Sequence, residues 1–476
     1  MSKRLLYSAA FTVLTVWLGF FTRRSDFGPF IGAYGLMFGL YALLIFKEKP
    51  EGADRRWYLG LGIALRIILL FGMPMFSDDY FRFLWDGRLL AQGIHPFAHP
   101  PEYYMAQPVL PAGLSGELYA RLNSPQYYTV YPPVCQAVFA LAGCLFPFGD
   151  QASVLVIKLF LLGCEVATIA GLTPRPPLQR SGGGDSNPGS ISPSPLERGP
   201  GGEVRPGGEA LGQASLAYAL NPLVLLEIVG NLHFEGAMIC FLIIGLNALE
   251  RNRLGAGAFW WALATASKLL PPLFLPVIWR WLGWRRGLRF VLLFGAITLA
   301  LFLPLLQPEV LANMGSSLNL YFRQFEFNAS VYYLAKFSGN QFSRWETGRL
   351  VGPALSGLTV LAVMALAIWR TAKNGKRERL YETLMLASAI YLFDATTVHP
   401  WYVIVPLVLS LGTRWRFAIV WSGTAALSYS HYEGGLFQEK WGLIALEYGV
   451  VWCFLLADLC RINPLNLLRR SSLPGF

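Results

Sequence analysis

The chain has 476 residues, of which 54% are hydrophobic and only 14% are charged, and its formal net charge is +11. A soluble surface cannot accommodate so much apolar sequence, so the composition excludes a soluble globular protein and predicts a polytopic membrane protein. A nucleic-acid partner is disfavoured as well, because Lys and Arg fall in short clusters between apolar runs and form no stripe or tail.

Apolar runs of spanning length recur along the whole chain. A helix that crosses a bilayer needs about 20 mainly apolar residues. Such runs lie near 5–21, 28–46, 57–76, 133–149, 152–172, 211–229, 234–249, 255–281, 288–306, 350–369, 381–398, 401–412, 416–430 and 441–459. The sequence therefore predicts an all-α polytopic membrane protein with about 12–14 transmembrane helices.

Three segments of the chain differ in composition. Residues 1–172 hold the first membrane helices and a large polar loop, 77–131, where we expect interfacial helices. Residues 211–476 hold further membrane helices and a second polar loop, 307–349. Residues 173–210 are rich in Gly and Pro and nearly lack aliphatic side chains. Because such a composition cannot bury a core, we expect 173–210 to be a disordered insert outside the fold.

The basic clusters predict how the chain is oriented. By the positive-inside rule they face the cytoplasm, so the loops 77–131 and 307–349, the turn 230–236 and the corner 399–401 all lie on the extracytoplasmic side. Three apolar runs separate 77–131 from 230–236, and an odd number of crossings would place these two segments on opposite sides. One run between 133 and 229 must therefore fail to span, or one must be double.

The stretch SDDYFRFLWDGRLLAQGIHPF (77–97) places charge directly beside an apolar run. If 79–92 is helical, Asp79, Arg82 and Asp86 share one stripe and Trp85 lies on another face. We expect an interfacial helix with its aromatic side toward lipid and its charged side toward a water-filled cleft. An ordinary interfacial helix with a solvated charged face is the alternative interpretation.

The same stretch holds the residue types that transfer from a lipid-linked phosphate donor needs. A transferase that uses a lipid-linked phosphate donor requires a carboxylate to take the proton of the acceptor hydroxyl, and cations to neutralise the leaving phosphate. Asp78 and Asp79 are the candidate carboxylates, and Arg88 follows within 20 residues. Adjacent carboxylates titrate as a pair, so the sequence does not rank the two aspartates.

Several motifs together carry a family resemblance. In chain order they are Asp78-Asp79, WDGR (85–88), HPF (95–97), YPP (131–133), NP (221–222), GNLHFEG (230–236), SKLLP (267–271) and HPW (399–401). With this set the chain resembles the GT-C superfamily of polytopic glycosyltransferases, and most closely bacterial mannosyltransferase-like members that use polyprenyl-phosphate sugars. The resemblance covers nearly the whole chain except 173–210.

This resemblance implies an activity and a location. It implies inverting transfer of a hexose, mannose by likeness, from a polyprenyl-phosphate donor to a glycan or glycolipid acceptor of the cell envelope. The transfer would take place at the extracytoplasmic face of the bacterial inner membrane. Asp78 is then the best candidate base, with Asp79 as its partner or as an acceptor ligand. In many relatives the turn reads His-x-Asp, whereas this chain has His233 and Glu235.

Further candidates are assigned to substrate binding. Lys268 interrupts an apolar run, where an ionisable group is costly unless it faces a cavity or a partner. Arginine suits phosphate geometry and aromatic rings suit sugars, which favours the segment 320–334. The full set of predicted substrate-binding residues is Arg88, His95, His233, Glu235, Lys268, Arg323, Asn328 and His399. Lys158 and Glu165 are predicted to make internal helix-packing contacts instead.

No metal constellation is visible in the sequence, because the carboxylates are adjacent and the histidines are scattered. A weakly bound divalent cation at Asp78 and Asp79 stays open, and no other cofactor is predicted. The rival function is a transporter or flippase of lipid-linked glycans, which should show internal repeats and a binding site near the bilayer midplane. We find no such repeat in the sequence.

Overall fold

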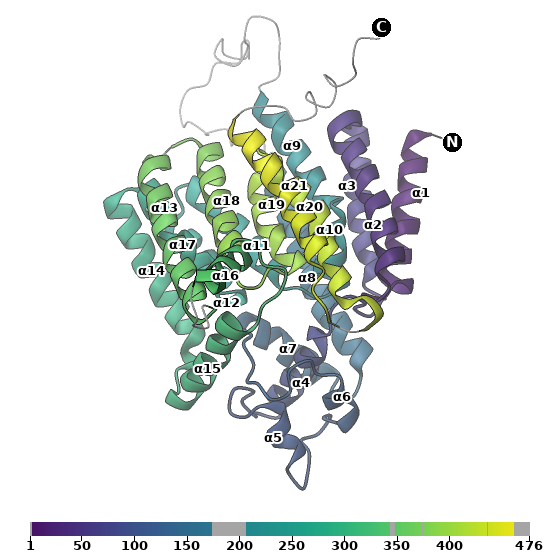
Figure 1. Ribbon diagram of the computed structural model, residues 1–476, viewed down its shortest axis with the longest axis vertical. Coiled ribbons are helices and arrows are strands. Elements are labelled where there is room, and N and C mark those ends of the chain that lie inside the picture. The colour runs from purple at the N-terminus through teal and green to yellow at the C-terminus, as the bar shows by residue number, and fades with distance from the viewer. Residues whose placement is uncertain (1, 174–205, 343–347, 374, 436, 461–476) are drawn as a thin grey trace, which may run out of the picture.

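The computed structural model describes residues 2–173, 206–342, 348–373, 375–435 and 437–460 (Figure 1). Within these ranges the side chains of 206–211, 318–324, 341–342 and 348–349 are not described. The described chain is helical throughout, and the extended pairing found in it is one isolated bridge between Phe327 and Thr397. The predicted all-α membrane class is confirmed.

By length and composition, six of the described helices could each cross a membrane. They are Lys3–Phe21 (α1 and η1), Phe27–Glu48 (α2 and η2), Asp150–Leu172 (α8), Trp284–Leu305 (α14 and η5), Leu350–Arg370 (within α17) and Trp441–Leu459 (α21). A bent pair, Gly212–Ala219 with Pro222–Gly230, would make a seventh. The other apolar runs form helices that are shorter or more charged, so this criterion counts fewer spans than the expected 12–14.

The elements whose bounds have not yet been given include α17 and the bent pair in full, together with the shorter helices of the bundle and of the lobe at its end. They are α3 (Gly52–Leu69), α4 (Asp79–Ala91), α5 (Pro101–Met105), α6 (Gly116–Ala120), α7 (Pro133–Leu145), α9 (Pro206–Ala219), α10 (Pro222–Val224), η3 (Leu225–Gly230), α11 (Glu235–Glu250), α12 (Leu254–Ser267), η4 (Pro271–Phe274), α13 (Leu275–Leu282), α15 (Pro308–Gln324), α16 (Val331–Phe342), α17 (Gly348–Arg370), α18 (Arg377–Asp394), η6 (Pro400–Val403), α19 (Ile404–Ser410), α20 (Phe417–Thr424) and η7 (Ala425–Gly435). Figure 1 shows α4 to α7 as a lobe below the bundle, with α15 beside it.

Of the three apolar runs between 133 and 229, the run 133–149 forms the helix that is too short to count as a span. It forms α7, whose 13 residues rise only about 20 Å, against the ~30 Å hydrocarbon core. This helix packs along α4 within the lobe instead (Figure 1). Only α8 and the bent α9–η3 pair then separate the lobe from residues 230–236. Consequently Asn231 reaches back to the start of the lobe, where its Oδ1 accepts hydrogen bonds from the backbone of Met75 and Phe76.

Helix α4 is buried over most of its length, so the expectation that its aromatic side faces lipid is wrong, and so is the alternative of a solvated charged face. Trp85 and Asp86 are fully buried, and Arg82 is 7% exposed. The reason is close packing against α7, because a Cβ atom at Gly87 would collide with the carbonyl oxygen of Phe139. The start of the charged stripe, at Asp79 and Arg82, lines the cavity described below, as expected of a side that faces a cleft.

The basic loops meet at the end of the bundle that lies away from the lobe. Arg377 pairs with Glu250 at 3.1 Å, and Arg414 approaches Glu382 at 3.7 Å. These contacts connect the loops after α11, α17 and α19. The molecule therefore has a basic end and an end that carries the lobe, as the distribution of charge in the sequence predicts.

The predicted packing role of Lys158 and Glu165 is confirmed. Lys158 Nζ donates to the carbonyl oxygens of Leu69 and Gly72, where α3 ends. Glu165 accepts from the fully buried Arg66 at 2.8–2.9 Å. Both residues therefore hold α8 against α3 and lie apart from the cavity described below.

Candidate active site

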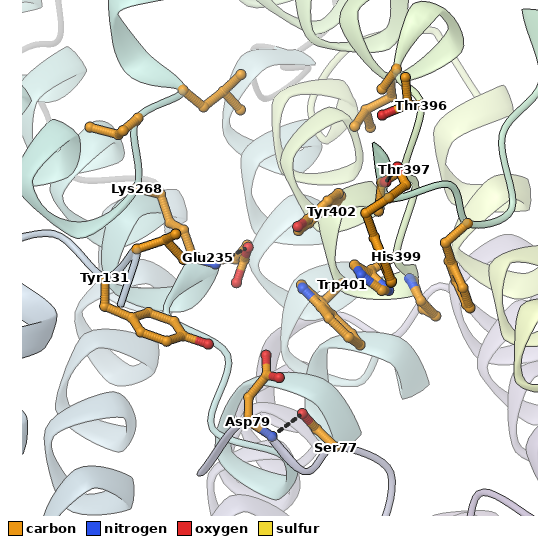
Figure 2. Close-up of a pocket in the computed structure, with 18 of the residues that line it drawn as sticks. Ser77, Asp79, Tyr131, Glu235, Lys268, Thr396, Thr397, His399, Trp401 and Tyr402 are labelled. Atoms are coloured by element: carbon orange, nitrogen blue, oxygen red, sulfur yellow. Dashed lines mark hydrogen bonds and ion pairs between the residues drawn. The ribbon is translucent and has the colours of Figure 1, made fainter. Parts of the chain in front are cut away.

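A cavity of about 860 Å³ opens where the start of α4 meets the bundle (Figure 2). Its wall is formed by α4, the 123–132 loop, the start of α11, the break after α12, α17 and the segment from α18 to η6. Five predicted site residues line it, and they come from parts of the chain that are far apart in sequence: Asp78, Asp79, Glu235, Lys268 and His399. A volume in this range suits a ligand of several hundred daltons.

The adjacent aspartates have different surroundings. Asp78 forms an ion pair with Arg24, which precedes α2, and its side chain is 37% exposed. Asp79 begins α4 and accepts a hydrogen bond from Asn123 Nδ2 at 3.0 Å. Figure 2 shows the Asp79 carboxylate pointing into the cavity, as does the Tyr131 hydroxyl. Asp79 is thus the carboxylate that a bound molecule would meet.

Burial controls the proton affinity of Asp79. Desolvation raises the pKa of its carboxyl above the usual value, and the nearby ammonium of Lys268 opposes this most. Hydrogen bonds from Asn123 and Tyr131 also lower the pKa, whereas the charge of Asp78 raises it. The result is a carboxylate that binds a proton more strongly than a solvated aspartate does, which is the property of a general base.

Glu235 and Lys268 form the central ion pair of the cavity. Lys268 follows the last residue of α12, where Pro271 prevents the helix from continuing, so its side chain leaves the helix and enters the cavity. Its Nζ lies 3.0 Å from Oε1 of Glu235, which begins α11 and is 3% exposed. The helix start favours a negative charge there. The pair keeps a lysine at the cavity surface without burying an uncompensated charge.

The rings of two histidines, His233 and His399, stack on the indole of Trp401. The His399 ring stacks on Trp401 with centroids 4.4 Å apart, and the His233 ring stacks on it at 3.6 Å. His233 lies behind the cavity wall, 3.3 Å from the carboxylate of Glu227. Burial lowers the pKa of His399 to about 3, and Lys268 adds to this effect. His399 is therefore a neutral ring that presents apolar surface and a hydrogen-bonding nitrogen.

Three predicted residues lie away from the cavity. Arg88 pairs with Asp150 at 2.5 Å in the lobe. His95 Nδ1 accepts from the backbone of Phe97. Asn328 takes a left-handed conformation, φ 48°, and donates to Glu447 at 3.1 Å. Each of these contacts has a structural purpose, because it satisfies a polar group in its own neighbourhood. Arg323 belongs to α15, and its side chain lies outside the described part of the structure.

The sequence did not single out several residues of the cavity wall. Arg24 reaches the cavity from the loop before α2, and Asn123 from the polar loop of the lobe. Neither residue belongs to a motif. The one sequence signal was a polar side chain, the guanidinium of Arg24 or the amide of Asn123, on the side of the membrane where the site was predicted. Trp401 belongs to the HPW motif, Tyr402 follows it, and Asp394 ends the helix that leads to it.

The cavity wall carries four carboxylates and three cations: Asp78, Asp79, Glu235 and Asp394, and Arg24, Arg82 and Lys268. Each of these cations has a carboxylate partner within the described part of the chain. In that same part, no group of three or more His, Cys, Asp or Glu side chains could hold a metal ion. The prediction of a weakly bound divalent cation stays untested.

The site thus combines an all-α membrane bundle with acidic residues and a lysine on the wall of one cavity. In a comparison with known families, residues 206–283 match the family described as alpha-(1->6)-mannopyranosyltransferase, N-terminal domain. The matched segment includes Glu235 and Lys268. The match confirms the predicted resemblance to GT-C mannosyltransferases and supports a glycosyltransferase activity. No curated protein sequence matches the chain.

Proposed function

We propose that this protein transfers a hexose, mannose by the matched family, from a polyprenyl-phosphate donor to a glycan or glycolipid acceptor at the extracytoplasmic face of the membrane. The observation that carries the proposal is the position of Asp79 and Lys268 on the wall of one cavity. A base and a phosphate-binding cation are the two groups that such a transfer requires. Family membership of 206–283 supplies the sugar class.

The transfer step follows from these positions. Asp79 removes the proton of an acceptor hydroxyl, and the resulting oxygen nucleophile attacks C1 of the hexose. The bond from C1 to the phosphate oxygen breaks, and its electron pair leaves with the polyprenyl phosphate. Lys268 neutralises the developing charge on that phosphate. Attack opposite the leaving group inverts C1, so an α-linked product, as in the name of the matched family, requires a β-linked donor.

Asp79, in place of Asp78, is the base in this proposal. Asp78 is held by Arg24, so its charge is already neutralised. Asp79 has a raised pKa and a carboxylate directed into the cavity. The ion pair of Asp78 then serves to fix the start of α4, where Asp79 is attached.

The apolar side of the cavity suits the polyprenyl chain. Leu269 and Val360 both line the cavity and are exposed on the outer surface, at 41% and 56%. Leu273 lies with them on the cavity wall. These residues flank the position of Lys268 in sequence or belong to the neighbouring α17. A donor can therefore place its phosphate at Lys268 while its tail passes between η4 and α17 into lipid.

The orientation rests on the two ends of the molecule. The basic loops after α11, α17 and α19 gather at the end opposite the lobe, and basic loops are retained in the cytoplasm. The cavity and the lobe then face the extracytoplasmic side of the bacterial inner membrane. This orientation supplies a reason for the lipid-linked donor, because nucleotide sugars are cytoplasmic substrates.

Transfer by the purified full-length protein in liposomes tests the proposal. Radiolabelled polyprenyl-phosphate mannose is supplied with glycolipid and mannoside acceptors, with and without a chelator of divalent cations. We expect labelled product from the wild type, none from Asp79→Ala, and normal product from Glu117→Ala, an exposed carboxylate of the lobe. Product formation by Asp79→Ala would contradict the role of Asp79. Movement of donor across the bilayer without transfer would favour the flippase.

A further inference from the structure

Across from Asp79, the cavity wall is an extended segment, residues 395–398, that follows Asp394, the last residue of α18. It joins the end of α18 to His399. Phe327 holds it on both sides, since its N–H donates to Thr396 O at 3.1 Å and its carbonyl accepts from Val398 N at 2.8 Å. Figure 2 shows Thr396 and Thr397 on the opposite side of the cavity from Asp79. The backbone of this wall is therefore fixed before any ligand enters.

Two polar groups of this wall have hydrogen-bonding capacity left over. Asp394 accepts one hydrogen bond, from Thr359 Oγ1 on α17 at 2.7 Å. Among the described side chains neither Asp394 nor the Thr396 hydroxyl has a further hydrogen bond or an ion pair, and both line the cavity. A carboxylate in a largely apolar enclosure is costly unless a ligand or water binds it. Its chemistry favours a neutral ligand rich in hydroxyl donors.

Once the acceptor and the donor phosphate are assigned to the other walls of the cavity, the hexose is the component that can bind at Asp394 and Thr396. The acceptor hydroxyl has to reach Asp79, and the donor phosphate has to reach Lys268 with its tail toward Leu269. A phosphate at Asp394 would be repelled by its charge. The remaining hydroxyls of the hexose have no other charged acceptor among the described residues of the cavity, because Glu235 is engaged by Lys268 and Asp78 by Arg24.

We propose that Asp394 and Thr396 bind hydroxyls of the transferred hexose and so determine which hexose the enzyme accepts. This inference rests on the proposed function and adds the specificity site to it. A carboxylate can accept hydrogen bonds from two neighbouring hydroxyls, and their spacing depends on the configuration of the sugar. A site that hydrogen-bonds a hydroxyl rejects a sugar that lacks it at that position, because the buried acceptor is then left without a partner.

Binding of two ligands that differ only in the sugar tests this inference. The affinity of the purified full chain is measured for polyprenyl-phosphate mannose and for polyprenyl phosphate. Asp394→Asn keeps the shape of the side chain and an oxygen for Thr359. We expect roughly 10- to 100-fold weaker binding of the mannosyl lipid, the range for hydrogen bonds to charged groups, and unchanged binding of polyprenyl phosphate. Glu309→Gln, an exposed carboxylate of α15, should change neither affinity.

A second readout is the choice of sugar. Competition between mannosyl, glucosyl and galactosyl donors should show weaker discrimination among the three sugars in Asp394→Asn than in the wild type. Thr396→Val gives the same test should Asp394→Asn melt at a lower temperature. Equal weakening of both lipids, or no change in either, overturns the specificity site. Equal binding of the two lipids by the wild type also overturns the specificity site. Absence of mannose transfer by the wild type in the liposome assay overturns the proposed function itself, so the two failures are distinguishable.

Discussion

The start and the middle of α4 hold carboxylates with opposite surroundings. Asp79, at the start, faces a cavity, and burial raises the pKa of its carboxyl. Asp86, two turns later, is fully buried, bonded to Arg82 Nε at 2.8 Å and to Gln136 Nε2 at 3.0 Å. Both aspartates lie on one stripe of one helix. The difference teaches that one charged stripe can open into a cavity at one point and be closed by ion pairing at another.

The largest expected effect is on catalysis at Asp79. Asp79→Asn should lower kcat by about 10²–10⁴, the contribution of a positioned general base. Asp78→Asn removes only a partly exposed ion pair, worth about 1 kcal/mol or less, and should lower kcat by roughly fivefold at most. Transfer of radiolabelled mannose under saturating donor measures both. Equal losses in the two variants would show that the aspartates act as one unit.

The next effect is on stability at Asp86. Asp86→Asn leaves the charge of Arg82 buried without its partner, and breaking such a pair costs about 3–5 kcal/mol. We expect a clearly lower melting temperature of the protein in detergent. The double variant Asp86→Asn with Arg82→Met serves as the control, because it removes both charges and should recover part of the loss. A normal melting temperature in the single variant would mean that water reaches this pair.

A smaller effect concerns the pH dependence of transfer. The base must be deprotonated, so kcat should rise with pH through the raised pKa of Asp79 and level off above it. Lys268 lowers this pKa, and Lys268→Met should therefore move the rising limb to higher pH. Lys268→Arg keeps the charge and should leave the limb in place. A limb that stays fixed in Lys268→Met would assign it to a different group.

The smallest expected effect is on stability at Asp79, where the same substitution has the opposite sign from that at Asp86. Because the folded state raises the pKa of Asp79, it binds the proton more tightly than the unfolded chain does, and stability falls as pH rises from the unfolded value through the folded one. At neutral pH the ionised carboxylate of Asp79 thus destabilises the folded state. Asp79→Asn should raise the free energy of unfolding by roughly 0.5 kcal/mol, whereas Asp86→Asn lowers it. Thermal unfolding of both variants at neutral and acidic pH measures this contrast.

The sequence predicted the membrane class, the basic end of the molecule and five of the residues that line the cavity. Hydropathy and charge suffice for these, because they act through composition and spacing. The burial of α4 was missed, since periodicity shows which residues share a face but not what covers that face. The partner of Asp78 was missed for a related reason, as Arg24 lies 54 positions earlier in an unremarkable loop.

Asn328 and Arg88 illustrate the opposite error. Arg88 belongs to a motif of the family resemblance and Asn328 to an aromatic-rich polar segment. In the structure, Asn328 bonds to Glu447 and Arg88 bonds to Asp150, both within the fold. A side chain that can bind phosphate or sugar can equally close a helix contact. Only the positions of its partners separate the two uses, and those come from tertiary structure.

In the proposed orientation, the short α7 decides the parity of the crossings that follow it. Because α7 packs within the lobe, the proposal counts no crossing between α4 and α8. If seven or so apolar residues lengthened α7 enough to cross the bilayer, at about 1.5 Å per residue, α8 and each later helix would insert upside down. Asp79 and Glu235 would then face different compartments, and a single shortened helix is therefore what allows a chain of many spans to assemble one chamber.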